Sequence, residues 1–449
     1  MLTRDIVLSD AVLDLLDNCV DGILRKKKGR LTGKRPYAGF RAEINYDKDT
    51  FEISDNCGGI PWKMHEYAFR IGRADNTIDA NLPTVGVYGI GMKRAMFKIG
   101  RHCLIHTQHK QDAYEVEITP SWLKKEDDWH IPVKASKSPM KEDGTSVVIS
   151  DLNEGVRSLF GEDKGLFDKE FRFKVATHYA FIINKGFEVE VNGDLISPRP
   201  TELRFDRNLA KKSIRPFIYQ TQIDGVDVFL AVGFTHPIPS QEDVEAEQEQ
   251  KRYSSLDAGW TVICNDRAVL YCDRTELTGW GEAGVPQYHT QFIAISGIVE
   301  FRSSNASLLP TTTTKRGIDA SSRLYLQVKN KMREGLRTFI DFTNKWKGKA
   351  LVRQAQDQIR RAKTQSLQDL KKSAALLKFS SVKTGAKGEQ YKPDLPRPPR
   401  KERDTQLISF RRQAREIRDV SDWLFGQSDI SPSKVGERCF ELQLKKVRK

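Results

Sequence analysis

The segment DAVLDLLDNCVDG at residues 10–22 restricts the fold more than any other stretch of the chain. Its apolar residues recur at helical spacing, which predicts a short amphipathic helix. Asp14, Asn18 and Asp21 lie three and four residues apart, so they share one face of that helix. A solvated polar face beside a buried stripe produces the same pattern as a ligand-binding face. The choice between the two therefore depends on the motifs that follow.

A second polar motif follows two segments of strand-like alternation at residues 40–46 and 51–55. Asp55 ends the second segment and begins the motif DNCGGIP. A carboxylate at this point can accept a hydrogen bond from an exocyclic amine, while Gly59 lets a flat ring approach the backbone. By itself, the motif is typical of a turn that begins with Asp.

A glycine-rich segment, GVYGIGMKRAMFKIG, begins at residue 86 and leads into a predicted helix. Gly86, Gly89 and Gly91 precede that helix, and free backbone N–H groups at a helix N-terminus attract anions. Lys93 adds positive charge in the first turn. The glycines lack the βαβ setting of a dinucleotide fingerprint, and the chain contains no GxxxxGK[ST] pattern, so neither of those phosphate sites is predicted.

Strand-like alternation returns over residues 103–150 and ends in GTSVVISDL. Thr145 stands at the start of this last strand, where its hydroxyl can lie beside Asp55. Taken alone, the GTS sequence is better explained by a tight turn into a strand.

Taken together and in chain order, these four stretches resemble the ATP-binding domain of the GHKL superfamily, which includes DNA gyrase, histidine kinases, heat-shock chaperones and MutL. The resemblance implies a GHKL (Bergerat) α/β sandwich over residues 1–152, with ATP and Mg²⁺ bound between helices and a mobile lid. Magnesium fits such a site because it takes oxygen ligands and shares phosphate oxygens with a nucleotide. The expected nucleotide-binding residues are Asn18, Asp21, Asp55, Gly59, Gly86, Gly89, Gly91, Lys93 and Thr145.

The resemblance also implies individual roles. Asn18 is expected to bind magnesium, Asp55 to accept from adenine, and Thr145 to lie near the base. The polar loop at residues 73–84 is expected to belong to the lid. Family members that hydrolyse ATP usually carry Glu four residues before the Asn, whereas this chain has Asp14. Because a general base must be placed to within an ångström, the shorter carboxylate predicts slow hydrolysis.

Residues 153–344 are predicted to form a second α/β domain. The segment VICNDRAVL resembles a strand, turn and strand of the ribosomal-S5-like transducer domains of MutL, gyrase and MORC proteins. In those families a transducer lysine reaches the γ-phosphate, and Lys315 in LLPTTTTKRGID fits that role. An exposed basic loop is the alternative explanation for Lys315.

The formal net charge of +14 is concentrated near the C-terminus. Residues 345–403 contain 17 Lys and Arg against 5 Asp and Glu, which gives +12 by subtraction. We expect a long basic helix and a Pro-rich linker there. We also expect an amphipathic helical tail at 404–449, with Phe410, Ile417, Trp423 and Leu424 available for packing. Such a basic helix commonly binds DNA phosphates, although a solvated face or a coiled coil gives the same composition.

These features favour an ATP-dependent DNA clamp that dimerises on ATP, with GIGMKRA closer to the MORC pattern than to MutL. Prokaryotic relatives of that type suggest anti-phage defence, and a companion protein is compatible with the motifs. A chaperone-like ATPase or the ATPase subunit of a topoisomerase-like complex remains an alternative. A histidine kinase is disfavoured, because no histidine lies in a dimerisation helix before residue 10. Six scattered cysteines and the lack of long apolar runs predict a cytoplasmic protein that does not enter a membrane.

Overall fold

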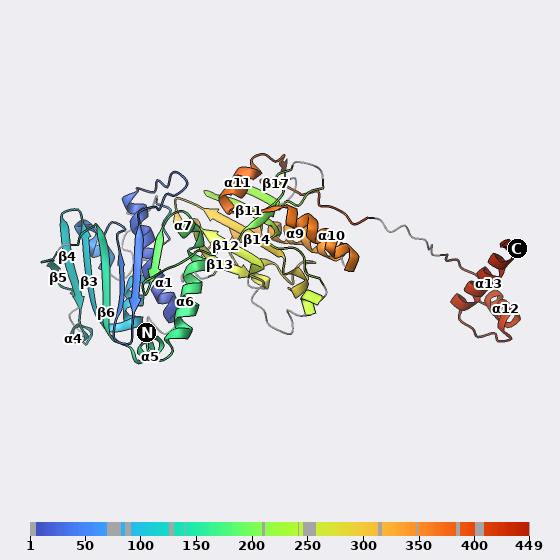
Figure 1. The fold of residues 1–449 in the computed structure, drawn as a ribbon, viewed down its shortest axis with the longest axis horizontal. Helices are drawn as coiled ribbons and strands as arrows, with labels where there is room; N and C mark the ends of the chain where they lie inside the picture. Colours follow the sequence, from blue (N-terminus) through green and yellow to red (C-terminus); the bar gives the residue numbers. More distant parts are fainter. Residues whose placement is uncertain are drawn as a thin grey trace. The chain divides into compact units, whose positions relative to one another are not determined.

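The computed structural model describes residues 6–69, 82–85, 91–124, 130–138, 140–208, 212–240, 242–245, 257–312, 317–346, 349–382, 387–399 and 408–448. The chain divides into two compact units, Met1–Pro398 and Pro399–Lys449, which are described separately. Within the first unit, the described strands form two large sheets and one short strand pair (Figure 1).

The first sheet has eight described strands in the order β5-β4-β3-β6-β2-β1-β7-β8. Each neighbouring pair is antiparallel except β1 and β7, which are parallel. The strands are β1 (Arg41–Tyr46), β2 (Phe51–Asp55), β3 (Gly100–His109), β4 (Asp112–Ile118), β5 (Val133–Ala135), β6 (Gly144–Leu152), β7 (Glu188–Val191) and β8 (Asp194–Leu195). The strands that alternation predicted at residues 40–46, 51–55 and 103–150 are therefore confirmed.

Helices pack against this sheet and against one another (Figure 1). They are α1 (Leu8–Lys26), α2 (His65–Phe69), α3 (Gly91–Ile99), α4 (Pro120–Leu123), α5 (Glu154–Phe160), α6 (Lys164–His178) and α7 (Ala180–Asn184), with a 3-10 turn at Trp62–Met64. The predicted amphipathic helix at residues 10–22 is the central part of α1. Its apolar residues join one continuous core with the inward-facing residues of the sheet.

The first sheet extends further along the chain than residue 152, where the sequence placed the domain boundary. Strand β7 pairs with β1 from Arg41↔Glu188 to Ile44↔Val191, and Val189 and Val191 are fully buried. The segment after residue 152 thus returns to complete the sheet of the first domain. The parallel pairing needs a long crossover, which α5, α6 and α7 provide.

The second sheet has the strand order β13-β12-β14-β11-β10-β17-β16 within the described residues, and β15 pairs with β9 beside it. The strands are β9 (Leu203–Phe205), β10 (Phe217–Ile223), β11 (Val226–Phe234), β12 (Gly259–Cys264), β13 (Arg267–Asp273), β14 (Ile295–Arg302), β15 (Lys363–Gln365), β16 (Ser380–Ser381) and β17 (Glu389–Tyr391). Short 3-10 turns lie at Glu276–Thr278, Thr290–Phe292 and Ala306–Leu308.

Helix α9 (Arg323–Lys345) packs closely against β10 and β11 of this sheet. A Cβ atom at Gly335 would lie 2.3 Å from a methyl carbon of Val232 and 3.0 Å from the ring of Phe217. Glycine therefore permits the close approach of helix and sheet. Apolar side chains of α10 (Lys349–Arg361), including Val352 and Ile359, continue the same core.

The expected long basic helix is interrupted. Helix α10 ends at Arg361, residues 363–365 form β15, and α11 (Leu367–Ala374) begins after the N-cap Ser366. The reason is tertiary: β15 pairs with β9, and Arg204 donates hydrogen bonds to the carbonyls of Ile359 and Ala362 at 3.4 and 2.9 Å. The backbone groups that would have continued the helix are satisfied in this way.

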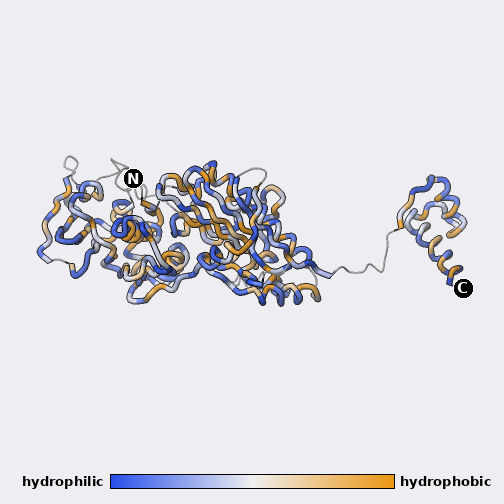
Figure 2. The backbone as a smooth tube through the Cα atoms, turned by 90° about the horizontal axis from the view of Figure 1, so that it is seen from above, coloured by the Kyte–Doolittle hydropathy of each residue, from blue (hydrophilic) through white to orange (hydrophobic). Residues whose placement is uncertain are grey.

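The second unit contains α12 (Ala414–Phe425) and α13 (Pro432–Val447), which pack together as a hairpin. Along both helices apolar residues alternate with hydrophilic ones (Figure 2). Phe410, Trp423 and Phe440 remain 69, 79 and 54% exposed. Among the helices that the structure describes, none is both long enough and apolar enough to cross a membrane.

Candidate functional site

Helix α1 is largely buried, and one residue in its middle is exposed. From Leu8 to Leu24, a stretch that the structure describes in full, Asn18 alone is exposed. Asp14 and Asp21, on the same face of the helix, are 6 and 1% exposed. An exposed amide in the middle of an otherwise buried helix, with carboxylates on the same face, suits a ligand that needs oxygen donors.

The N-terminus of α3 lies directly against Asp14. A Cβ atom built on Gly91, the first residue of α3, would lie 3.4 Å from Cβ and 3.5 Å from Oδ2 of Asp14. Lys93 in the first turn is 8% exposed, and burial lowers the pKa of its ammonium group to about 8. The helix N-terminus that the sequence predicted as an anion site is thus placed beside α1. Gly86 and Gly89 lie outside the described residues.

Asp21 fixes a short segment of chain onto α1. Its Oδ1 accepts a hydrogen bond from the backbone N–H of Val85 at 2.6 Å. The segment 82–85 is the end of the polar loop that the sequence assigned to a lid, while residues 73–81 lie outside the described part of the chain. This anchoring role was not predicted, and a contact between Asp21 and nucleotide stays a prediction.

Asp55 stands at the end of β2, opposite Thr145 in β6. Its carboxylate accepts hydrogen bonds from the backbone N–H of Cys57 at 2.7 Å and from the thiol of Cys19 at 3.5 Å. Desolvation nevertheless dominates and raises the pKa of Asp55 from 3.8 to about 6. Cys19 links this carboxylate to α1, so Asp55 and Asn18 belong to one local structure.

The turn after Asp55 is held by a buried hydroxyl that was not predicted from the sequence. Thr107 is fully buried, accepts from the backbone N–H of Ile60 at 2.8 Å, and lies 3.1 Å from the hydroxyl of Thr145. Thr107 occupies a position in β3 whose side chain faces inward by strand alternation. A polar residue at such a position was the signal in the sequence that could have indicated a buried hydrogen bond. Gly59 has φ +62°, and a Cβ atom there would lie 1.9 Å from the carbonyl oxygen of Gln108. Sheet packing is therefore a sufficient reason for glycine at this position.

Comparison with known families agrees with this geometry. Residues 6–151 match the family described as "Histidine kinase-, DNA gyrase B-, and HSP90-like ATPase". These residues form a GHKL-type ATPase domain. The matched range contains α1, the turn after β2, α3 and the start of β6, and the mixed α/β architecture agrees with it. No curated protein matches the chain.

Lys315 lies outside the described residues, but the base of its loop is described. Thr311 and Ile318 form an antiparallel bridge, and the backbone N–H of Thr312 donates to the carbonyl of Gly317 at 3.1 Å. A small cavity between the second sheet and the GHKL domain is lined by Thr84, Val85, Cys264, Arg267, Val269, Ala306, Leu309 and Thr311. The base of the loop therefore lies next to the segment that Asp21 anchors.

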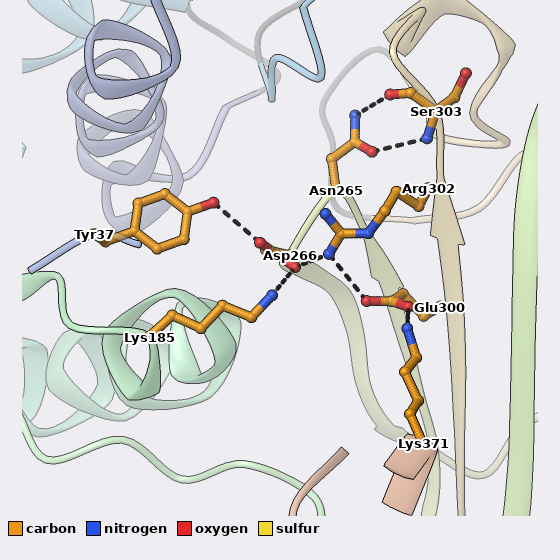
Figure 3. A network of polar contacts seen from close by, with 8 residues as sticks. All are labelled: Tyr37, Lys185, Asn265, Asp266, Glu300, Arg302, Ser303 and Lys371. Carbon is orange, nitrogen blue, oxygen red and sulfur yellow. Dashed lines mark hydrogen bonds and ion pairs between the residues drawn. The ribbon is translucent and has the colours of Figure 1, made fainter. Parts of the chain in front are cut away.

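The second sheet is attached to the GHKL domain through the turn between β12 and β13 (Figure 3). Asn265 and Asp266 occupy this two-residue turn with φ values of +46° and +70°, as a tight hairpin requires. Asp266 accepts from Tyr37 at 3.0 Å and from Lys185 at 2.5 Å, and it also pairs with Arg302. Burial raises the pKa of Asp266, but the neighbouring cations outweigh burial and bring it to about 2. The turn is therefore a buried, charged attachment point.

Proposed function

We propose that the chain is an ATP-binding, slowly hydrolysing conformational switch that acts on DNA. The observation that carries the ATP-binding part is the position of α1, where Asn18 is exposed. The same helix contacts the N-terminus of α3 through Asp14 and contacts Asp55 through Cys19. One site thus contains an amide oxygen, an anion-attracting helix end and a carboxylate for an exocyclic amine. The oxygen donors fit Mg²⁺, which when bound neutralises phosphate charge.

Asp14 is the proposed general base. Its carboxylate lies against the first residue of α3, where a phosphate would bind. A carboxylate at this position can take a proton from an attacking water. Since Asp is one methylene shorter than Glu, we expect binding to be more effective than turnover.

Lys315 is proposed to couple nucleotide state to domain position. The base of its loop lies near segment 82–85, which supports a contact between the loop and bound nucleotide. A lysine that binds the γ-phosphate draws the second domain toward the first only while the triphosphate is intact. Closure of this kind would also promote dimerisation, as the resemblance to MORC and MutL implies, and would serve a role in genome defence.

DNA binding is proposed for the exposed side of α10 and the residues that follow it. Arg353, Arg360 and Arg361 are exposed, whereas the apolar side of the helix is buried against the second sheet. A cationic face on a fixed helix can neutralise phosphates without reading sequence. Lys363 and Lys372 extend the exposed positive charge.

ATP binding can be tested by calorimetric titration of the full chain with Mg-ATP. Asn18→Ala is expected to weaken Mg-ATP binding by about 10-fold or more, because a metal ligand is lost. Asp14→Asn is expected to retain binding and to lower hydrolysis by about 100-fold or more, because the base is lost. Asn45→Ala and Asp49→Asn, which change exposed residues outside the site, serve as matched controls. Wild-type protein that binds no Mg-ATP would contradict the proposal.

DNA binding can be tested by measuring the affinity for duplex DNA at 50 to 200 mM salt. A protein with about six phosphate contacts loses roughly 1,000-fold in affinity over this range. Replacing Arg353, Arg360 and Arg361 together with Gln should weaken binding and flatten the salt dependence. The control replaces Lys134, Lys137 and Lys141, which are not on α10. A salt-independent affinity, or an equal loss in the control, would exclude this surface.

A protein-directed, chaperone-like function is the second candidate. The observation that favours it is the apolar surface of the second unit, where Phe410, Trp423 and Phe440 are exposed. If duplex DNA does not bind while an unfolded model protein does, and removal of residues 399–449 abolishes that binding, the chaperone-like function is favoured over the DNA clamp.

A further inference from the structure

A residue of the second sheet reaches the helix that carries Asn18. Arg267, the first residue of β13, donates from Nε to Oδ1 of Asp17 at 2.7 Å, and the two side chains are 1 and 0% exposed. The hydroxyl of Tyr179 donates to the same carboxylate oxygen. The guanidinium also lies 5.2 Å from the centroid of the Tyr179 ring. Asp17 is thus held from the second sheet and from the C-terminal end of α6.

The position of Asp17 on α1 gives this contact a functional consequence. Asp17 precedes Asn18 directly and lies less than one turn from Asp14. Within a hydrogen-bonded helix, neighbouring residues move together. A shift of Asp17 would therefore move both the proposed magnesium ligand and the proposed base, and small displacements in such sites strongly affect binding and rate.

Arg267 is itself firmly placed. It follows Asp266, which is bound by Tyr37, Lys185 and Arg302 at the attachment point shown in Figure 3. Arg267 also lines the small cavity next to Val85 and Thr311. The second sheet thus meets α1 at the residue beside Asn18, and does so close to the base of the Lys315 loop.

We propose that Arg267 is a positioning residue for the nucleotide site, which holds Asp17 so that Asn18 and Asp14 face the bound magnesium and phosphates. Binding of Mg-nucleotide then depends on how the second sheet is seated against α1. This inference rests on the proposed ATP-binding function.

The test compares the affinity for ATP in the presence of Mg²⁺ with the affinity in EDTA, using full-length protein and titration calorimetry. Arg267→Met is expected to reduce the gain in affinity from Mg²⁺ by about 10- to 100-fold, the usual effect of losing a partner that orients a metal ligand. The affinity in EDTA should change little, because Asp55 and the adenine side of the site are untouched.

Lys185→Met is the matched control. It removes a cation from the same attachment point, where the Lys185 ammonium group pairs with Asp266. If Arg267 only strengthens the attachment, Arg267→Met and Lys185→Met will reduce the gain in ATP affinity from Mg²⁺ by the same factor. That result would show that the inference is wrong. The expected result is a loss in Arg267→Met alone.

A double variant, Asp17→Asn with Arg267→Met, separates positioning from stability. Removing one partner leaves a buried charge, whereas replacing both avoids that penalty, so the double variant should unfold cooperatively at a higher temperature than Arg267→Met. Its Mg²⁺ effect should stay low, because the contact with α1 is still missing. Recovery of both stability and the Mg²⁺ effect would overturn the inference, and this comparison applies even if Arg267→Met does not fold. Wild-type protein that fails to bind Mg-ATP would instead refute the proposed function itself.

Discussion

Asp55 and Lys93 carry opposite charges when ionised, and both lie in the candidate site. Burial raises the pKa of Asp55 and lowers the pKa of Lys93. Asp55 keeps its proton up to about pH 6, and Lys93 loses its proton from about pH 8. Because the folded chain holds the Asp55 proton to a higher pH than the unfolded chain does, ionisation of Asp55 lowers stability as the pH rises through 6. Nucleotide binding would use that ionised form.

We therefore expect ATP affinity to be highest between pH 6 and 8. Below pH 6 protonated Asp55 no longer offers a carboxylate to adenine, and above pH 8 neutral Lys93 no longer attracts phosphate. On the acidic side and on the alkaline side of this range, ATP affinity should fall by up to about tenfold per pH unit. Calorimetry from pH 5 to 9 checks this expectation, with Asp55→Asn flattening the acidic limb and Lys93→Met the alkaline one. Protonation of ATP itself affects all three proteins equally, so identical profiles would contradict it.

The turn after Asp55 gives a second prediction at the scale of one residue. Gly59→Ala should lower the free energy of unfolding by more than about 3 kcal/mol, because its Cβ would overlap the Gln108 carbonyl at 1.9 Å. Gly33 has a similar backbone conformation, with φ +84°, but open space around it. Gly33→Ala should therefore cost only about 1 kcal/mol. Urea unfolding measures both, and equal costs would show that steric overlap is not the cause.

At the scale of elements, α1 has contacts in both parts of the first unit. Its buried side packs in the GHKL core, its exposed Asn18 faces solvent, and Asp17 is bound by Arg267. The second sheet needs its own fixed framework to hold such a contact. Helix α9, which packs tightly across β10 and β11, provides that framework.

A methyl group added at Gly335 should displace helix α9 from the second sheet. Gly335→Ala should cost about 1 to 3 kcal/mol of unfolding free energy, because the added carbon would meet Val232 at 2.3 Å in a packed core. Gly165→Ala in α6 is the control, since nothing lies within 4 Å of the added carbon. That variant should be neutral or slightly more stable because Ala favours helix. A neutral Gly335→Ala, measured by urea unfolding, would mean that α9 is more loosely packed.

At the scale of the whole molecule, the proposed clamp requires ATP to change the association of chains. We expect sedimenting mass to double with a non-hydrolysable ATP analogue and to remain that of one chain with ADP. The reason is that only the triphosphate offers a γ-phosphate to Lys315 and so draws the domains together. Lys315→Met should abolish the doubling, whereas Lys345→Met, at the end of α9, should not. Equal mass with both nucleotides would exclude ATP-dependent dimerisation.

The sequence alone determined the GHKL domain and most of its secondary structure. Helix α1, the strands of residues 40–46, 51–55 and 103–150, and the helix after Gly91 follow from local periodicity and from motifs whose chemistry depends on a few neighbouring residues. The strand, turn and strand that the resemblance implied for VICNDRAVL are also confirmed, as β12, the turn at Asn265 and Asp266, and β13.

Only the tertiary structure decided which distant segments meet. Strand β7 completes the first sheet, the basic segment after residue 345 folds onto the second sheet, and Arg267 reaches across 250 residues of chain to Asp17. Local patterns record which side of an element is apolar, but they do not record its partner. Which remote strands pair, and which cation compensates a buried carboxylate, depend on the packing of the whole chain. The contact between Arg267 and Asp17 could therefore not be predicted from the sequence.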